Sequence, residues 1–146
     1  TMSPSENIRA LVRSPLLNTR LSALACLVNF NRCCAAAVGG QWTAADRTSD
    51  HALAAAIIKV LHASDAGVEA AWCTAADLLA RLVTADEELQ RMASETSAMS
   101  RLKTLLGLCQ EGMDYQLASS RERLHAAALS AVAALCEQCE PARLQA

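Results

Sequence analysis

Aromatic side chains are scarce in this chain: Trp, Tyr and Phe make up 3% of its 146 residues, whereas hydrophobic residues of all kinds make up 53%. The apolar content therefore consists mainly of Ala and Leu, which are the strongest helix formers. Five Gly and three Pro are too few for an all-β protein, because such a protein needs many turns. These shortages predict an all-α fold in which small side chains let the helices pack closely.

An excess of positive charge is also lacking. The 13 Lys and Arg residues stand against 15 Asp and Glu residues, the net charge is −2, and no basic block occurs. Nucleic acids and anionic membranes are bound by cationic surfaces, so neither is expected as a partner. No apolar run approaches the ~18 residues of a membrane-spanning helix. The first residues do not combine a cationic segment with an apolar core, so no secretory signal is expected.

Motifs for catalysis, cofactors and metals are missing too. No Gly-rich phosphate loop occurs, and none of the three histidines lies in a metal or catalytic motif. Cys136 and Cys139 form one C-x₂-C pair, but a zinc site needs four ligands and commonly two such pairs. We expect Cys136 in the core, Cys139 partly exposed at a helix end, and neither a metal nor a cofactor. A non-enzyme is therefore predicted. A small helical hydrolase with a Cys–His pair is an alternative, because such partners can be distant in sequence.

The seven cysteines bear on the compartment. Their number is odd, and most of them occupy apolar helical positions. Reduced thiols in the cytoplasm or the nucleus are therefore expected, in preference to a disulfide framework.

What the chain does contain is a repeated helical pattern. Apolar residues spaced i, i+3, i+4 and i+7 place one stripe on a helix. The middle copy of the stripe consists of Ala75, Leu78, Leu79, Leu82 and Val83. The copy 53 positions later (128 − 75) consists of Ala128, Ala131, Val132, Leu135 and Cys136. The copy 55 positions earlier (75 − 20) consists of Arg20, Ala23, Leu24, Leu27 and Val28, and only Arg20 breaks the pattern. We predict core side chains at Trp72, Leu24, Leu27, Leu79, Leu82, Val132 and Leu135.

Shorter helices are predicted between these long ones. One kind precedes each long helix, with apolar residues at Ile8, Leu11 and Val12, at Ile57, Val60 and Leu61, and at Leu102, Leu105 and Leu106. A second kind begins with acids, which are favourable in a first helical turn, at Asp86 to Glu88. Residues 140–144 resemble the start of another such helix, with Pro141 in its first turn. Loops are expected at residues 39–49 and 110–120, where the connections carry insertions.

Three helices in each unit, the first of them short, is the plan of armadillo repeats. We expect residues 1–146 to form a single armadillo-like right-handed α-solenoid of about three units, as a fragment of a longer solenoid. The offsets of 53 and 55 exceed the usual ~40–47 residues of such repeats, and the insertions explain the excess. Two-helix HEAT units and a plain α-bundle are the alternatives.

Several segments of this pattern are also similar to one known family. The most specific run is Glu88-Leu89-Gln90-Arg91, followed by an apolar residue and then Ala93-Ser94. The other segments are Val68–Ala71, Ala76–Val83, Arg121–Leu124 leading into Ala126–Ala128, and Arg47–Asp50 before an apolar helix. In these residues the chain resembles the armadillo scaffold subunit of the GID/CTLH ubiquitin ligase complex. The resemblance spans residues 19–146 and covers an interior portion of the longer family member.

This resemblance implies a non-catalytic protein scaffold. The family's solenoid binds an exchangeable substrate receptor and attaches it to the RING-type ligase subunits of the complex. The expected partners are therefore proteins, namely the substrate receptor and other subunits of the ligase. Another armadillo or HEAT adaptor, which binds a peptide or helix of a different partner, is the alternative, as is a homo-oligomerising helical-repeat protein.

The partner-binding surface is predicted just outside the apolar stripe of the long helices, which line a concave groove in armadillo stacks. The candidates are Asp77 and Arg81, with Thr74 and Thr84 beside them, and the equivalent positions Ser22 (77 − 55) and Ser130 (77 + 53). Arg81 corresponds in the same way to Cys26 and Ala134. Such a surface would bind an extended chain through hydrogen bonds to its backbone, and a merely solvated surface is the alternative. Self-association of the isolated chain is expected through an uncovered apolar end near Leu129, Val132 and Leu144.

Overall fold

The computed structural model describes residues 10–11, 14–37, 44–63, 69–84, 86–110, 118–137 and 139–146. Within these ranges all regular structure is α-helical, which confirms the all-α prediction. The helices in chain order are α2 (Leu17–Ala37), α3 (Ala44–Leu61), α4 (Glu69–Val83), α5 (Glu87–Ser94), α6 (Ala98–Gln110), α7 (Ala118–Cys136) and α8 (Glu140–Gln145). None of the helices in these ranges has both the length and the apolar character that crossing a membrane requires.

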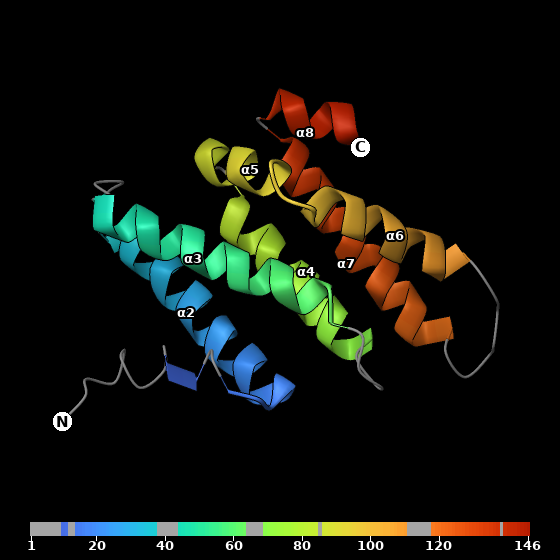
Figure 1. Cartoon of the computed structure of the whole chain (residues 1–146), viewed down its shortest axis with the longest axis horizontal. Coiled ribbons are helices and arrows are strands. Elements are labelled where there is room, and N and C mark those ends of the chain that lie inside the picture. Colours follow the sequence, from blue (N-terminus) through green and yellow to red (C-terminus); the bar gives the residue numbers. More distant parts are fainter. Residues whose placement is uncertain are drawn as a thin grey trace.

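The long helices α2, α4 and α7 form a row in which α4 lies between the other two (Figure 1). A second row consists of α3 and α6, which contact each other; α3 packs against α2 and α4, and α6 packs against α7. The short helices α5 and α8 contact each other and both pack against α7. The described helices therefore lie in two rows of long helices with the short ones along one edge.

The core follows the predicted stripes, and it is most complete at α4. All five stripe positions of α4 are buried, and Trp72 is buried as predicted. Burial likewise confirms the predictions for Leu24, Leu27 and Leu135. Val132 was predicted in the core but is only half-buried. The difference is physical, because α4 has a long helix on each side, whereas no described long helix follows α7 in the row.

Two pairs of helix ends repeat at a fixed distance along the chain. Val83 and Cys136 end α4 and α7, and Glu87 and Glu140 begin α5 and α8. Both pairs are 53 positions apart (136 − 83 and 140 − 87), which is also the offset of the apolar stripe. The short helices α5 and α8 were therefore predicted correctly.

The turn from a long helix into a short one carries the same kind of hydrogen bond in both copies, α4 to α5 and α7 to α8. In the first copy, the buried Gln90 side chain donates from Nε2 to the carbonyl oxygen of Val83, the last residue of α4, at 2.9 Å. In the second copy, Arg143 donates from Nε to the carbonyl oxygen of Cys136, the last residue of α7, at 2.7 Å. Because 143 − 90 is also 53, the hydrogen bond itself recurs at the offset. Such bonds satisfy carbonyls that a helix end leaves without a partner.

The start of α5 also follows its sequence. Asp86 takes the N-cap position, and its carboxylate accepts a hydrogen bond from the backbone N–H of Leu89 at 3.2 Å. Glu87 and Glu88 then occupy the first turn, where the helix dipole favours acids. The equivalent N-cap of α8 is Cys139, which makes no side-chain cap bond, and a proline lies in the first turn of α8.

Both expected loop ranges overlap helices of the structure. Helix α3 begins at Ala44, so residues 44–49 of the expected 39–49 loop are helical, and residues 39–43 lie outside the described ranges. The polar residues there were interpreted as loop, but Ala44 and Ala45 begin the helix with strong helix formers, and polar residues are well tolerated in first turns. Asp50 accordingly lies inside α3 and is buried.

The expected loop at residues 110–120 also overlaps helices at both of its ends. Gln110 still belongs to α6, and α7 already begins at Ala118, which leaves residues 111–117 outside the described ranges. In the first predicted short helix, Ile8 and Val12 are likewise outside the described residues, and Leu11 is exposed where a core position was expected.

Replacing Leu82 with Ala tests the stripe. The side chain is 3% exposed in α4, so its truncation should lower the free energy of unfolding by about 2–5 kcal/mol. The matched control is Leu16→Ala, because Leu16 is 67% exposed and its loss should cost less than about 0.5 kcal/mol. Urea denaturation followed by circular dichroism measures both. Equal midpoints for the two variants would mean that the stripe is not core.

Candidate partner-binding surface

The exposed side of α4 carries three of the six predicted binding residues. Thr74, Asp77 and Arg81 are all exposed. At ~100° per residue they lie within about 60° of one another around the helix axis, opposite the buried stripes. Thr84 is half-buried and sits at the edge of this surface. The structure thus places three of the four candidates of α4 together.

The two charged candidates have no ion-pair partner among the described residues. In the described part of the chain, neither Asp77 nor Arg81 has a salt-bridge partner, although they are spaced i, i+4. By contrast, Glu87 and Arg91 on α5 have the same spacing and form an ion pair at 3.2 Å. Asp77 and Arg81 therefore offer one acceptor and one donor group to a partner.

The two threonines contribute less than the sequence suggested. The Thr74 hydroxyl donates to the carbonyl oxygen of Ala70, and the Thr84 hydroxyl donates to that of Ala80. Such bonds to the preceding turn occupy the donor of each side chain. A partner would consequently meet them mainly as acceptors and as methyl groups.

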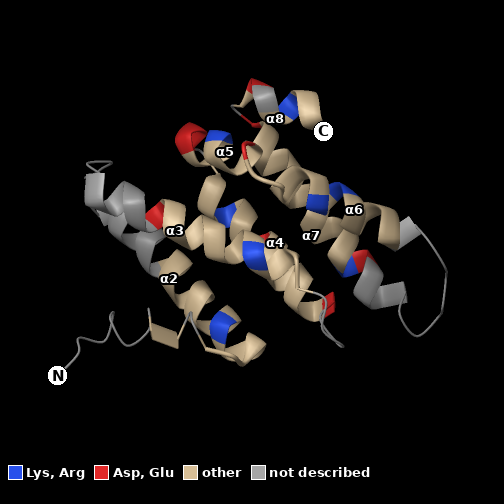
Figure 2. Ribbon diagram, in the orientation of Figure 1, with Lys and Arg blue, Asp and Glu red and all other residues tan. Residues whose placement is uncertain are grey.

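The equivalent positions on the neighbouring helices are small and polar. Ser22 of α2 and Ser130 of α7 are both exposed, and they occupy the same place relative to the buried stripe as Asp77 does on α4. Cys26 is exposed as well, whereas Ala134 is half-buried. Charged residues are scattered over the described helices, with no continuous stripe of one sign beside these positions (Figure 2). Among these candidate positions, the row α2–α4–α7 therefore offers small polar groups on its outer helices and charged groups on its middle helix.

A cluster of hydrogen bonds connects the end of α3 to α4 and to α6. Trp72 donates from Nε1 to the carbonyl oxygen of Ala63 at 2.9 Å, and Arg101 donates from Nε to that of Leu61 at 2.6 Å. The Arg101 guanidinium also lies 5.0 Å from the centroid of the Trp72 ring, which is cation–π geometry. His62 Nε2 and Ser97 Oγ are 2.8 Å apart at the same place. Sequence reasoning found the burial of Trp72 but not the role of Arg101, whose only signal was a cation beside the apolar Leu102.

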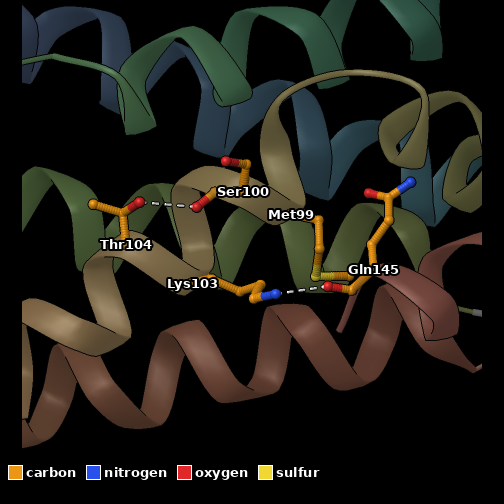
Figure 3. Close-up of a pocket in the computed structure, with 5 residues that line it drawn as sticks. All are labelled: Met99, Ser100, Lys103, Thr104 and Gln145. Atoms are coloured by element: carbon orange, nitrogen blue, oxygen red, sulfur yellow. Dashed lines mark hydrogen bonds between the residues drawn. The ribbon is translucent and has the colours of Figure 1, made fainter.

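A shallow depression of about 500 Å³ lies between α6 and α8 (Figure 3). Its lining residues are Met99, Ser100, Lys103, Thr104 and Gln145. The Lys103 ammonium donates to the backbone carbonyl of Gln145 at 2.9 Å, and the Thr104 hydroxyl donates to that of Ser100 at 3.0 Å. The Gln145 side chain donates from Nε2 to the carbonyl oxygen of Ser94 at 2.9 Å. The hydrogen bonds of Lys103 and Gln145 therefore connect α8 to α6 and to the end of α5 at this depression.

The C-x₂-C pair is arranged differently from the prediction. Cys139 is buried, with its Sγ 3.8 Å from Oγ of Ser94, whereas Cys136 is only half-buried at the end of α7. The prediction reversed the two because it assigned Cys136 to a fully covered stripe. Burial raises the pKa of the Cys136 thiol, Arg143 opposes that rise, and Cys139 adds to it. Among the described residues, no three His, Cys, Asp or Glu side chains gather in a way that could hold a metal ion.

No family model, no curated protein and no solved structure matches the chain. The candidate surface is therefore interpreted from its own geometry.

Thiol alkylation tests the environment of Cys136. A raised pKa leaves less thiolate at neutral pH, so Cys136 should react with iodoacetamide more slowly than the exposed Cys26. The rate at Cys136 should continue to rise as the pH is raised, because the thiolate fraction grows up to and past the raised pKa. Peptide mapping by mass spectrometry gives the rate at each site. If Cys136 reacts faster than Cys26 at neutral pH, the described environment is wrong.

Proposed function

We propose that the chain is a non-catalytic protein-interaction scaffold, built as an armadillo-like right-handed α-solenoid. The observation that carries this proposal is the recurrence of one hydrogen bond, from Gln90 to Val83 and from Arg143 to Cys136, at the 53-residue offset of the stripes and helix ends. Stacked copies of one unit account for a repeated corner, because each copy must turn from a long helix into a short one in the same way. A plain α-bundle gives no reason for the recurrence.

The scaffold would bind through the exposed residues of its row of long helices. Asp77 can accept a hydrogen bond from a backbone N–H, and Arg81 can donate to a backbone carbonyl. Ser22 and Ser130 offer hydroxyls at the corresponding positions on either side. An extended segment lying across the row would meet these groups in succession, and its backbone would supply the complementary donors and acceptors.

We further propose that this partner is the substrate receptor of a GID/CTLH-type ubiquitin ligase. The support is the sequence resemblance, whose most specific run, residues 88–94, lies in α5. An armadillo or HEAT adaptor for a peptide or helix of another partner is the alternative, and it shares the same surface chemistry.

Reversing both charges of α4 tests the surface. The variant Asp77→Arg with Arg81→Glu changes the side chains offered to a partner but leaves the buried stripe untouched. Its unfolding free energy should stay within about 0.5 kcal/mol of the unmodified chain, as is usual for exposed positions. Its affinity for the receptor subunit, measured by isothermal titration calorimetry, should fall about tenfold or more, a loss of roughly 1.4 kcal/mol.

The matched control reverses Glu87 and Arg91, an exposed i, i+4 pair on α5 that keeps its ion pair when exchanged. This control should bind as the unmodified chain does. Unchanged affinity of the Asp77/Arg81 variant would place the binding surface elsewhere. Failure of the unmodified chain to bind any receptor subunit would remove the ligase assignment while leaving the scaffold proposal to be judged on other partners.

A further inference from the structure

One side of α4 is covered and the same side of α7 is open. The positions concerned are spaced i, i+4, i+7 and i+11, so they share one face of each helix. On α4 they are all buried, and they are Trp72, Ala76, Leu79 and Val83. Fifty-three positions later on α7 they are His125, Leu129, Val132 and Cys136. Of these four, Leu129 is 46% exposed and the others are half-buried. We call these four residues the open face of α7.

The exposure of this face follows the position of the helix in the row. Of the corresponding positions of α2, Leu21, Leu24 and Val28 are buried, as those of α4 are, and Leu17 at the start of the helix is half-buried. Both α2 and α4 have another long helix after them in the row, and among the described helices α7 has none. We infer that each long helix packs against the next long helix of the row through this face.

The side chains that a helix would present to this face can be inferred from α7 itself. The side of α7 that is completely buried consists of Leu124, Ala128, Ala131 and Leu135, spaced i, i+4, i+7 and i+11. Its two alanines allow close approach, and its two leucines supply most of the buried apolar area. We call these four residues the inner stripe. On α4 the same four positions, Ala71, Ala75, Leu78 and Leu82, are also buried and also combine two alanines with two leucines.

The open face is shaped for such a helix. Leu129 is flanked on the exposed side by Ala126 and Ala133, which are also exposed. On α4, the same flanking positions are the small residues Cys73 and Ala80. The other exposed large apolar residues of the described chain are Leu11, Leu16, Leu108 and Leu144. None of them belongs to α2, α4 or α7.

We propose that the open face of α7 is a docking site for one amphipathic helix that carries the inner stripe, two leucines around two alanines. The helix is supplied by a partner protein, and its packing side has the same chemistry as that of the long helices of this chain. The site continues the packing that already joins α2 to α4 and α4 to α7. This docking site is separate from the candidate surface around Asp77 and Arg81, and it does not depend on which protein binds there.

A peptide copy of α7 tests this site directly. An end-blocked, fluorescein-labelled peptide of residues 118–137 carries the inner stripe and would be titrated with the full chain by fluorescence anisotropy. Saturable one-to-one binding is expected. The same peptide with Ala128→Glu and Ala131→Glu keeps the length but loses the stripe, and it should bind about tenfold more weakly or not at all.

Variants of the protein locate the peptide. Leu129→Glu should weaken binding about tenfold or more, because it puts a charge at the centre of the open face. Ala133→Arg, a second exposed substitution on the same face, should do the same by blocking close approach. The matched control is Leu16→Glu, where a 67% exposed leucine lies just before α2 and not on α7, and it should leave the affinity unchanged. Circular dichroism confirms that each variant is folded.

Several results would overturn the proposal. Equal binding of both peptides, or binding that neither Leu129→Glu nor Ala133→Arg affects, would show that the face is not the site. The absence of saturable binding would do so as well. Concentration-dependent dimerisation of the chain, measured by analytical ultracentrifugation and abolished by Leu129→Glu, would assign the face to a second copy in place of a helix with the inner stripe.

Discussion

The packing of α4 on both sides is the constraint on which the rest of the structure depends. Eight of its fifteen residues are buried, because α2 and α7 lie on opposite sides of it and α3 packs against it as well. A helix covered in this way needs two adjacent apolar stripes and leaves only a narrow exposed strip. That strip carries Asp77 and Arg81. The helix at the centre of the core thus also carries the two charged residues of the candidate surface.

Small side chains make this packing feasible in a chain with few aromatics. Ala75 and Ala76 of α4, and Ala128 and Ala131 of α7, are almost wholly buried, so the axes of neighbouring helices can approach closely. Each helix then buries little area by itself and relies on its neighbours for stability, as the units of repeat proteins do. The corners held by Gln90 and Arg143 supply what the apolar stripes lack, which is a fixed direction for the chain as it leaves a long helix.

The spacing of apolar residues correctly predicted the helices and most of their buried sides. The stripes of α4 and α2, the core position of Trp72 and the short helices at Glu87 and Glu140 all follow from spacing and from first-turn residues. The start of α3 was misplaced, since polar composition is a weak guide where alanines can begin a helix. The burial of Val132 and Cys136 was overestimated, because a pattern says which side is apolar but not whether anything covers it. Contacts between distant residues, such as Arg101 with Leu61, cannot be predicted from local spacing.

Native-state hydrogen exchange tests the central claim, that the helices form a stack of units centred on α4. In a stack, stability is a sum of unit and interface contributions, so local opening becomes easier toward the ends. The amides of α4 should show the largest opening free energy, and protection should decrease outward to the first turns of α2 and to α8. Exchange of α2, α4, α7 and α8 with one common opening free energy, without denaturant and at low denaturant concentration, would contradict this account and indicate a single cooperative bundle.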